Sequence, residues 1–222
     1  MNSLSLLAQA GTEPIRQNWL TWYIGACGPF FGPLFFLISI VFVTLVIMNW
    51  LAISRNAIVP MEMIEQFHEK LEAKEYQEAY EMAQNSDSTL GKILAVGLVK
   101  MSDNAAVAAA EKAMNDAAEE DVMTLEHRLS YLGTVASVAP MVGLLGTVWG
   151  MIIAFGEIAQ TGVPQASKLA GGIATALVTT QIGLLIAIPA LVFFEVFKTR
   201  LARLVLELSV QIESTLDRFK AR

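Results

Sequence analysis

The sequence predicts an all-α membrane protein with three transmembrane helices and long cytoplasmic helical extensions. Apolar residues make up 55% of the 222 residues and charged residues 16%, below the roughly 25% that is usual for a soluble domain. Three stretches of 38, 28 and 26 residues carry no charged side chain: 17–54, 129–156 and 169–194. Because about 20 apolar residues cross the hydrocarbon core of a bilayer, each stretch is long enough to span it. Buried helices of a soluble protein rarely lack charge over such lengths three times in one chain.

Basic residues near the ends of the spans set which side of the membrane each segment faces. Arg55, Arg128 and Lys198 flank the spans on one side, and we expect that side to be cytoplasmic. The expected segments are an outer N-terminal segment 1–26, a first transmembrane helix 27–53, a cytoplasmic helical domain 54–128, a second transmembrane helix 129–156, an outer loop 157–168, a third transmembrane helix 169–194 and a cytoplasmic C-terminal helix 195–222.

Aromatic residues mark both ends of the first span. Trp22 and Tyr23 lie at its outer end and Trp50 at its inner end. A continuous helix from Tyr23 to Trp50 would be about 40 Å long at about 1.5 Å per residue. This matches a bilayer of about 40–45 Å with its headgroups, at whose boundaries Trp and Tyr are enriched. These aromatic residues therefore mark the expected membrane boundaries of the first span.

The segment between the first two spans is acidic and helical by pattern. Residues 55–128 carry 15 acidic and 7 basic side chains, a net charge of −8, which argues against binding to nucleic acid. Ile64, Phe67 and Leu71 recur at helical spacing. Residues 85–89, with the sequence NSDST, break the pattern with capping and turn residues. From Asn104 we expect one long helix that continues into the second span.

An apolar stripe runs along the C-terminal helix at helical spacing. Two interpretations are open for it. The stripe packs on the cytoplasmic helices of the same chain, or it packs between copies of the chain in an oligomer. Its residues are Leu201, Leu204, Leu208, Ile212, Thr215 and Phe219.

The sequence contains no pattern that indicates an enzyme, a cofactor or a metal site. Cys27 is the sole cysteine, so no disulfide forms within the chain. His68 and His127 stand far apart without a Cys pair or an H-E-x-x-H motif, and we interpret both as solvated helix residues. The chain has no G-x-x-x-x-G-K-[ST] motif for nucleotide hydrolysis and no plausible pair of nucleophile and base. Any energy for work is therefore expected to come from elsewhere.

The second and third spans each carry a face of small residues. Small faces let helices approach closely within a membrane, and they can also line a space kept open for something else. Pro140 and Pro189 are expected to kink these two helices. The small or polar positions are Ala136, Ala139, Gly143, Thr147, Gly150 and Ala154 in the second span, and Gly172, Thr175, Thr179 and Gly183 in the third, with Thr180 on an adjacent strip.

The hydroxyl groups of these spans suggest a polar interface or an ion pathway. A single threonine in a span often bonds only to its own helix, but three occur between 175 and 180 beside Gln181. Hydroxyls can order water or coordinate an ion, but they do not hold a proton charge near neutral pH. No ionisable side chain lies in 129–156 or 169–194. If protons pass, a partner must supply the carboxylate.

Several motifs in the last two spans resemble one known family. The motifs GLLGTVWGM, GIATALVTT and GLLIAIPA, within about residues 128–219, resemble the ExbB/TolQ/MotA proton-channel family, nearest to its ExbB-like members. Over the first span and the cytoplasmic domain, the resemblance is one of layout only. Three spans favour the ExbB/TolQ branch, because the flagellar stator members have four.

The resemblance implies a homopentamer around a central pore in the bacterial inner membrane, with a periplasmic N-terminus. A dimer of an ExbD-like single-span protein would sit in the pore, and its transmembrane aspartate would carry the proton past Thr147 and Thr180. Proton flow would drive rotation and energise a TonB-like protein for outer-membrane import. The alternatives are a Tol-type envelope-maintenance motor subunit, a non-conducting membrane scaffold and a self-contained transporter.

One position departs from the family pattern. Many relatives have GIAEAL, with a glutamate where this chain has Thr175. The role of that glutamate in proton transfer is absent here or met differently. Proton is the predicted ion and sodium the alternative, since hydroxyl-rich sites suit sodium. The cargo of the energised system and the number of partner chains are not specified by the sequence.

Overall fold

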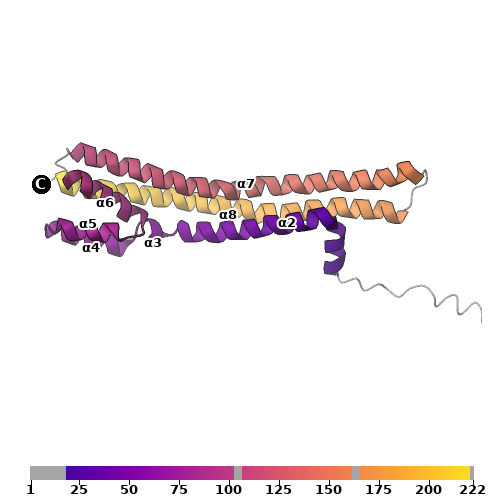
Figure 1. The fold of residues 1–222 in the computed structure, drawn as a ribbon, viewed down its shortest axis with the longest axis horizontal. Helices are drawn as coiled ribbons and strands as arrows, with labels where there is room; N and C mark the ends of the chain where they lie inside the picture. Colours follow the sequence, from indigo (N-terminus) through magenta and orange to yellow (C-terminus); the bar gives the residue numbers. More distant parts are fainter. Residues whose placement is uncertain (1–18, 103–106, 162–165, 221–222) are drawn as a thin grey trace, which may run out of the picture. The chain divides into compact units, whose positions relative to one another are not determined.

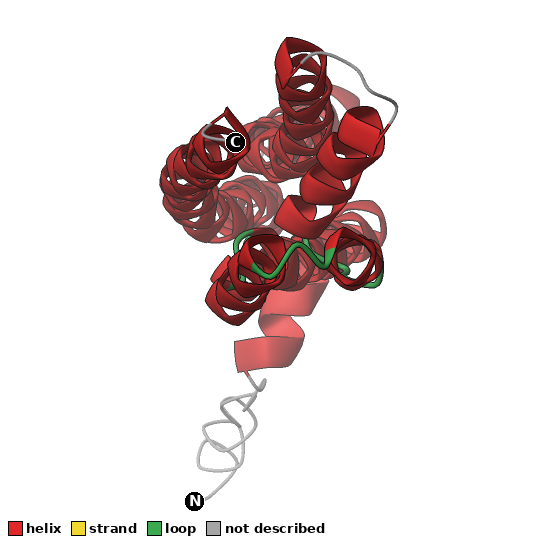
Figure 2. Ribbon diagram, turned by 90° about the vertical axis from the view of Figure 1, so that its left-hand side faces the viewer, coloured by secondary structure: helices red, strands yellow, loops and turns green. Residues whose placement is uncertain are grey.

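The computed structural model describes residues 19–102, 107–161 and 166–220, and these residues form helices joined by loops (Figure 2). The helices are labelled in Figure 1. They are α2 (Trp19–Ala52), α3 (Arg55–Ile58), α4 (Met61–Glu72), α5 (Tyr76–Gln84), α6 (Thr89–Ser102), α7 (Val107–Thr161) and α8 (Ala166–Lys220).

Three of these helices are long and apolar enough to cross a membrane. The candidate spans lie within Trp22–Ala52, Val107–Ala159 and Ala166–Arg218. The prediction of three spanning helices is therefore confirmed at the level of length and composition. α7 and α8 each run for 55 residues, so the long helix expected to enter the second span, and the helix expected to leave the third, are both present. Both continue through Pro140 and Pro189, and the kinks expected there stay predictions.

The helix that carries the first span is not continuous from Tyr23 to Trp50. At Gly28 the backbone adopts φ 71° and ψ 171°, which divides α2 into two helical pieces. Glycine reaches this positive φ without a Cβ clash, and the following Pro29 disfavours the helical conformation for the residue before it. Proline is well suited to the first turn of a helix, so the second piece begins there. From Pro29 to Ala52 it is about 36 Å long at about 1.5 Å per residue, enough for a core of about 30 Å.

The contacts of the chain divide it into two compact units. The first unit comprises Met1–Leu37 and Pro140–Leu184, and the second comprises Ile38–Ala139 and Leu185–Arg222. α2, α7 and α8 each contribute residues to both units. The first unit holds most of the predicted functional residues, and the second holds the predicted cytoplasmic helices.

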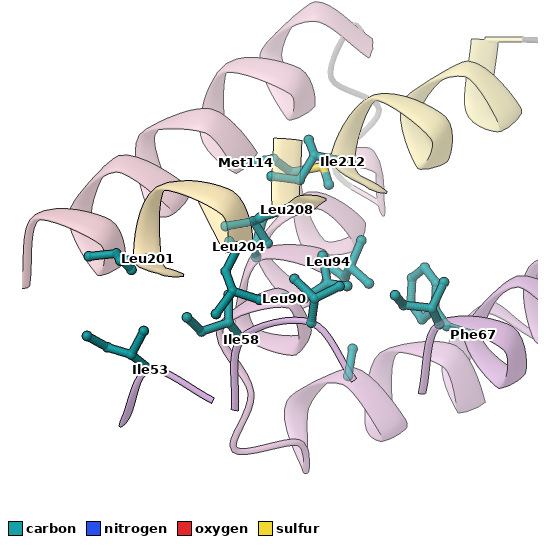
Figure 3. Packing of buried hydrophobic residues seen from close by; sticks show 14 of the residues in the cluster. Ile53, Ile58, Phe67, Leu90, Leu94, Met114, Leu201, Leu204, Leu208 and Ile212 are labelled. Carbon is teal, nitrogen blue, oxygen red and sulfur yellow. The ribbon is translucent and has the colours of Figure 1, made fainter. Parts of the chain in front are cut away.

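A cluster of large apolar side chains forms the core of the second unit (Figure 3). The stripe on α8 lies in this cluster, with Leu208 only 1% exposed. Its partners include residues of α3, α4 and α6, so the structure supports packing on the chain's own helices for the stripe up to Thr215. Phe219 lies outside the described side chains. The partners include Ile58, Ile64, Phe67, Leu90, Ile93 and Leu94.

His68 differs from the solvated residue that the sequence suggests. Its ring is half-buried beside α8, and its Nε2 lies 3.3 Å from the Thr215 hydroxyl. Burial lowers the pKa of His68 from its ordinary value, and the positive charge of Arg218 lowers it further, against an opposing effect of Glu72. Arg218 itself donates to Glu72 of α4 at 2.6 Å. His127 is exposed, as expected, and its Nε2 lies 3.0 Å from the Tyr131 hydroxyl.

Candidate functional site

Within the first unit, α7 and α8 touch through their backbones. A Cβ added at Gly150 would lie 2.6 Å from the carbonyl oxygen of Gly172 and 2.8 Å from the amide nitrogen of Ala176. A Cβ added at Gly172 would lie 2.7 Å from the Cβ of Ala154. Real Cβ atoms do not approach other heavy atoms this closely, so helices that meet this way need small residues at the contact. The small faces of the two helices therefore lie against each other along this stretch.

The contact continues toward the middle of the two helices. A Cβ added at Gly143 would lie 3.1 Å from the Cα of Thr180 and 3.4 Å from the Cα of Gly183. Both glycines are buried. Ala139, which the sequence places on the same face, is also fully buried but belongs to the second unit.

Thr179 is the most deeply buried threonine of this contact, with no exposed surface. Its hydroxyl donates to the backbone carbonyl of Thr175 at 2.9 Å and of Ala176 at 3.1 Å, both on its own helix. The side chain fills the space beside Gly146. A Cβ added there would lie 2.4 Å from the Oγ1 of Thr179 and 2.5 Å from its Cβ.

Thr147 of α7 and Thr180 of α8 meet across the contact, and their hydroxyls are hydrogen-bonded to each other. The Thr180 hydroxyl also lies 3.2 Å from the carbonyl oxygen of Gly143, and the Thr147 hydroxyl lies 3.3 Å from that of Ala176. Each hydroxyl has one hydrogen. One therefore donates across the pair while the other donates to a backbone carbonyl. Both side chains are half-buried.

Two further polar residues of α8 lie apart from this pair. Thr175 is half-buried, and its backbone carbonyl accepts the Thr179 hydroxyl. Gln181 is exposed, and its Oε1 accepts a hydrogen bond from the hydroxyl of Tyr23 on α2. The structure thus brings together two of the four threonines named from the sequence, packs one between the helices and leaves one outside the pair.

Sequence reasoning missed Gly146 and the bond between Tyr23 and Gln181. Gly143, Gly146 and Gly150 recur at spacings of three and four, which is the signal for one helix face, so Gly146 was detectable. The contact of Tyr23 depends on how α2 lies beside α8, which no local pattern specifies.

The site is electrically neutral by composition. The spans contain no charged residue between Leu129 and Gly156 or between Leu169 and Phe194. Farther along the two helices, Lys168 of α8 pairs with Glu157 of α7 at 2.7 Å. Among the residues that the structure describes, no group of three or more His, Cys, Asp or Glu is placed to hold a metal ion. The paired hydroxyls are suited to ordering water, to coordinating a cation or to hydrogen bonding with a carboxyl group.

Comparison with known proteins finds relatives across this part of the chain. The matching family is described as the MotA/TolQ/ExbB proton channel family, and the match covers residues 85–210, more than half of the chain. The Tol-Pal system protein TolQ of Haemophilus influenzae is 48% identical over 85 residues, which cover 37% of this chain and 36% of that protein. The biopolymer transport protein ExbB of Salmonella typhimurium is 49% identical over 67 residues, which cover 30% of this chain and 28% of that protein.

A longer alignment joins the chain to an ExbB-like biopolymer transport protein of Synechocystis sp. The two are 32% identical over 143 residues, which cover 62% of this chain and 67% of that protein. By contrast, the chain matches only about a third of the lengths of the Haemophilus and Salmonella proteins. The matched region contains both members of the hydroxyl pair. The chain belongs to the MotA/TolQ/ExbB proton channel family.

Proposed function

We propose that the chain is an ion-channel subunit of a motor in the bacterial inner membrane that is driven by the proton-motive force. With an ExbD-like partner, it energises a TonB-like protein for outer-membrane import. The observation that carries this proposal is the hydroxyl pair of Thr147 and Thr180, held between two spanning helices inside the region that matches the family.

Because the hydroxyl pair is uncharged, we assign the ionisable side chain of the pathway to a partner protein. Ion and proton pathways in membranes usually contain an ionisable side chain, and these two spans contain none. A transmembrane aspartate of a single-span partner would supply it, and the hydroxyls would bond to that carboxyl or to water beside it. Each elementary charge that crosses gains about 2.3 kcal/mol per 100 mV, so a few ions suffice for mechanical work.

The proposed assembly is a homopentamer with the second and third spans around a central pore and a partner dimer inside it. α7 and α8 support this arrangement by carrying large apolar side chains on exposed faces, such as Leu144, Trp149 and Leu185. Lipid and neighbouring copies would cover these faces. The proposed orientation has the N-terminus in the periplasm and the C-terminus in the cytoplasm, and the basic residues at the span ends support it.

Thr175 bears on which ion is conducted. By the resemblance to the family it stands where many members have a glutamate, and its half-buried side chain lies outside the hydroxyl pair. We propose that the proton is the conducted ion and that the partner's carboxyl acts without a second carboxyl at this position. Activity that follows a sodium gradient, and persists when the proton gradient is collapsed, would identify sodium instead.

A Tol-type envelope-maintenance motor is the second candidate function. It is favoured by the similarity to the Haemophilus TolQ protein, which is as high as the similarity to the Salmonella ExbB protein. The two functions separate in a strain that lacks both systems. Restored outer-membrane import supports the TonB-type motor, whereas restored envelope integrity supports the Tol-type motor.

The proposed pathway is tested by Thr147→Val and Thr180→Val. Each removes one hydroxyl and keeps the side-chain shape, so each is expected to abolish energised activity while the protein assembles normally. Thr44→Val is the matched control, because Thr44 of α2 is an exposed threonine whose hydroxyl bonds to Ile40 of its own helix at 2.9 Å. Full activity of both test variants, with normal assembly, would favour the non-conducting scaffold.

A further inference from the structure

Two neighbouring threonines of α8, Thr179 and Thr180, differ in burial and in the partners of their hydroxyls. Thr180 is half-buried, and its hydroxyl reaches across to Thr147 of α7. Thr179 is fully buried, and its hydroxyl donates to carbonyls of its own helix. The Thr179 side chain touches α7 at Gly146, where even one added carbon would overlap it. The hydroxyl of Thr180 therefore has a partner on the other helix, whereas that of Thr179 is satisfied within α8.

We propose that Thr179 is a positioning residue that, seated on Gly146, fixes the approach of α7 and α8 at which the hydroxyls of Thr147 and Thr180 meet. Its shape performs this role and its hydroxyl does not. The effect on conduction rests on the proposed function, whereas the contact of Thr179 with Gly146 does not depend on it. It reassigns Thr179, which the sequence groups with the ion pathway, to the support of that pathway.

The order of the residues in the sequence explains why the contact of Gly146 with Thr179 controls the distance between the hydroxyls of Thr147 and Thr180. Gly146 directly precedes Thr147, and Thr179 directly precedes Thr180. A group that separates Gly146 from Thr179 therefore moves the two hydroxyls with it, since each helix moves as a rigid body over one residue. Removing the Thr179 hydroxyl leaves both acceptor carbonyls within a regular helix, where they keep their backbone hydrogen bonds.

A cross-linking experiment measures this approach directly. Thr147→Cys and Thr180→Cys are combined in a Cys27→Ala background, and the rate of disulfide formation between them is followed in membranes. Because a disulfide tolerates only a narrow range of distances between the two residues, the rate reports the approach of the helices whether or not the protein conducts. Four further changes are tested in this background: Thr179→Val, Gly146→Ala, Gly146→Ala with Thr179→Gly, and the control Gly171→Ala.

The proposal predicts a cross-linking rate for each of the four changes. Thr179→Val keeps the shape and cross-links at the parent rate, whereas Gly146→Ala slows cross-linking by about tenfold because the overlap forces the helices apart. The combined change removes the side chain of Thr179 that the added methyl group would overlap, and it regains most of the rate. Gly171→Ala cross-links at the parent rate, since nothing lies within 4 Å of a Cβ added there.

Conduction is measured separately, with both threonines of the pair intact. Thr179→Val is expected to keep energised activity per assembled complex, and Gly146→Ala to lose it. An inactive Thr179→Val protein that still cross-links at the parent rate would show that the hydroxyl acts in conduction, which overturns the proposal. Parent-rate cross-linking of the Gly146→Ala protein would overturn it as well.

The outcomes also separate this proposal from the proposed function. If Thr147→Val and Thr180→Val both remain active, the pathway is wrong, but the cross-linking pattern still tests the contact. If Gly146→Ala fails to accumulate in the membrane, Thr179→Val decides by itself. Parent-rate cross-linking with retained activity supports the positioning role, and a loss of either overturns it.

Discussion

Each of the two units is packed internally by a different kind of side chain. In the first unit, α7 meets α8 through glycine, alanine and threonine, and their backbones come into direct contact at Gly150 and Gly172. In the second unit, the helices are separated by leucine, isoleucine and phenylalanine side chains, as in the cluster around Phe67 and Leu208. The first unit packs closely because its contact residues are small, whereas large apolar side chains fill the space between the helices of the second unit.

The proposed surroundings of the two contacts account for the difference, because the contact of α7 with α8 lies in the predicted membrane spans and the cluster around Phe67 lies among the predicted cytoplasmic helices. In a bilayer, lipid tails are as apolar as leucine, so helices associate through close packing and hydrogen bonds. In water, burial of apolar area drives association at about 25 cal/mol per Å². The first unit should therefore be sensitive to added atoms and the second to removed atoms.

The largest effect is expected from removing a ring in the second unit. Phe67 is fully buried in the apolar cluster, so Phe67→Ala loses its transfer free energy and leaves a cavity. We expect the free energy of unfolding of this unit to fall by about 3–5 kcal/mol, measured by chemical denaturation in detergent. Met61→Ala is the control, because the same truncation at a 46% exposed side chain on α4 should change little.

A smaller effect, of the opposite kind, is expected from adding one methyl group to the first unit. Gly150→Ala places a Cβ 2.6 Å from the Gly172 carbonyl oxygen, and backbone cannot move aside as a flexible side chain can. Overpacking of this kind costs about 1–3 kcal/mol, seen as a lower thermal midpoint and a loss of energised activity. Gly156→Ala has nothing within 4 Å of the new Cβ and should be neutral or slightly stabilising.

The sequence was informative where a long or periodic pattern decides the structure. Three uncharged stretches predict three apolar helices, and the spacing of Leu201, Leu204 and Leu208 predicts a buried stripe. Which partner covers that stripe was left open, because periodicity describes one face and not what lies opposite. The structure places α3, α4 and α6 there.

Length and periodicity did not predict the break at Gly28, nor did they predict which threonine pairs with Thr147 and which is buried. A long apolar run with aromatic ends is compatible with one helix, and the Gly-Pro step that divides it is a local feature the length argument ignores. Thr179 and Thr180 differ by one residue in sequence. Only the position of α7 decides which of them is buried against Gly146 and which reaches Thr147.

The effect of pH on the second unit provides a finer test of its packing. Burial lowers the pKa of His68 below its ordinary value of 6.5, so the folded chain holds this ring neutral. As the pH falls below 6.5, the unfolded chain binds the proton first, and stability is lost through the window between the ordinary and the lowered pKa. Above that window the ring has no effect.

His68→Gln keeps a hydrogen-bonding side chain beside Thr215 and removes the titration. The parent should lose more thermal stability than this variant on acidification below 6.5, and the two should run parallel above it. The exposed His127, changed to glutamine, is the control and should follow the parent. Identical acid profiles for the parent and the His68→Gln protein would contradict the effect of burial.

The smallest effect is expected at the ion pair between Arg218 of α8 and Glu72 of α4. Their side chains are 45% and 70% exposed, and exposed pairs contribute about 0.2–1 kcal/mol, less in high salt. Glu72→Gln should therefore lower the thermal midpoint slightly at low salt and not at high salt.

Arg218→Gln removes the same pair, but it also removes the positive charge that lowers the pKa of His68. Its acid sensitivity should consequently begin at the same pH as in the parent but span a narrower window. A loss from either change as large as that of Phe67→Ala would mean that charge, and not the apolar cluster, holds α4 to α8.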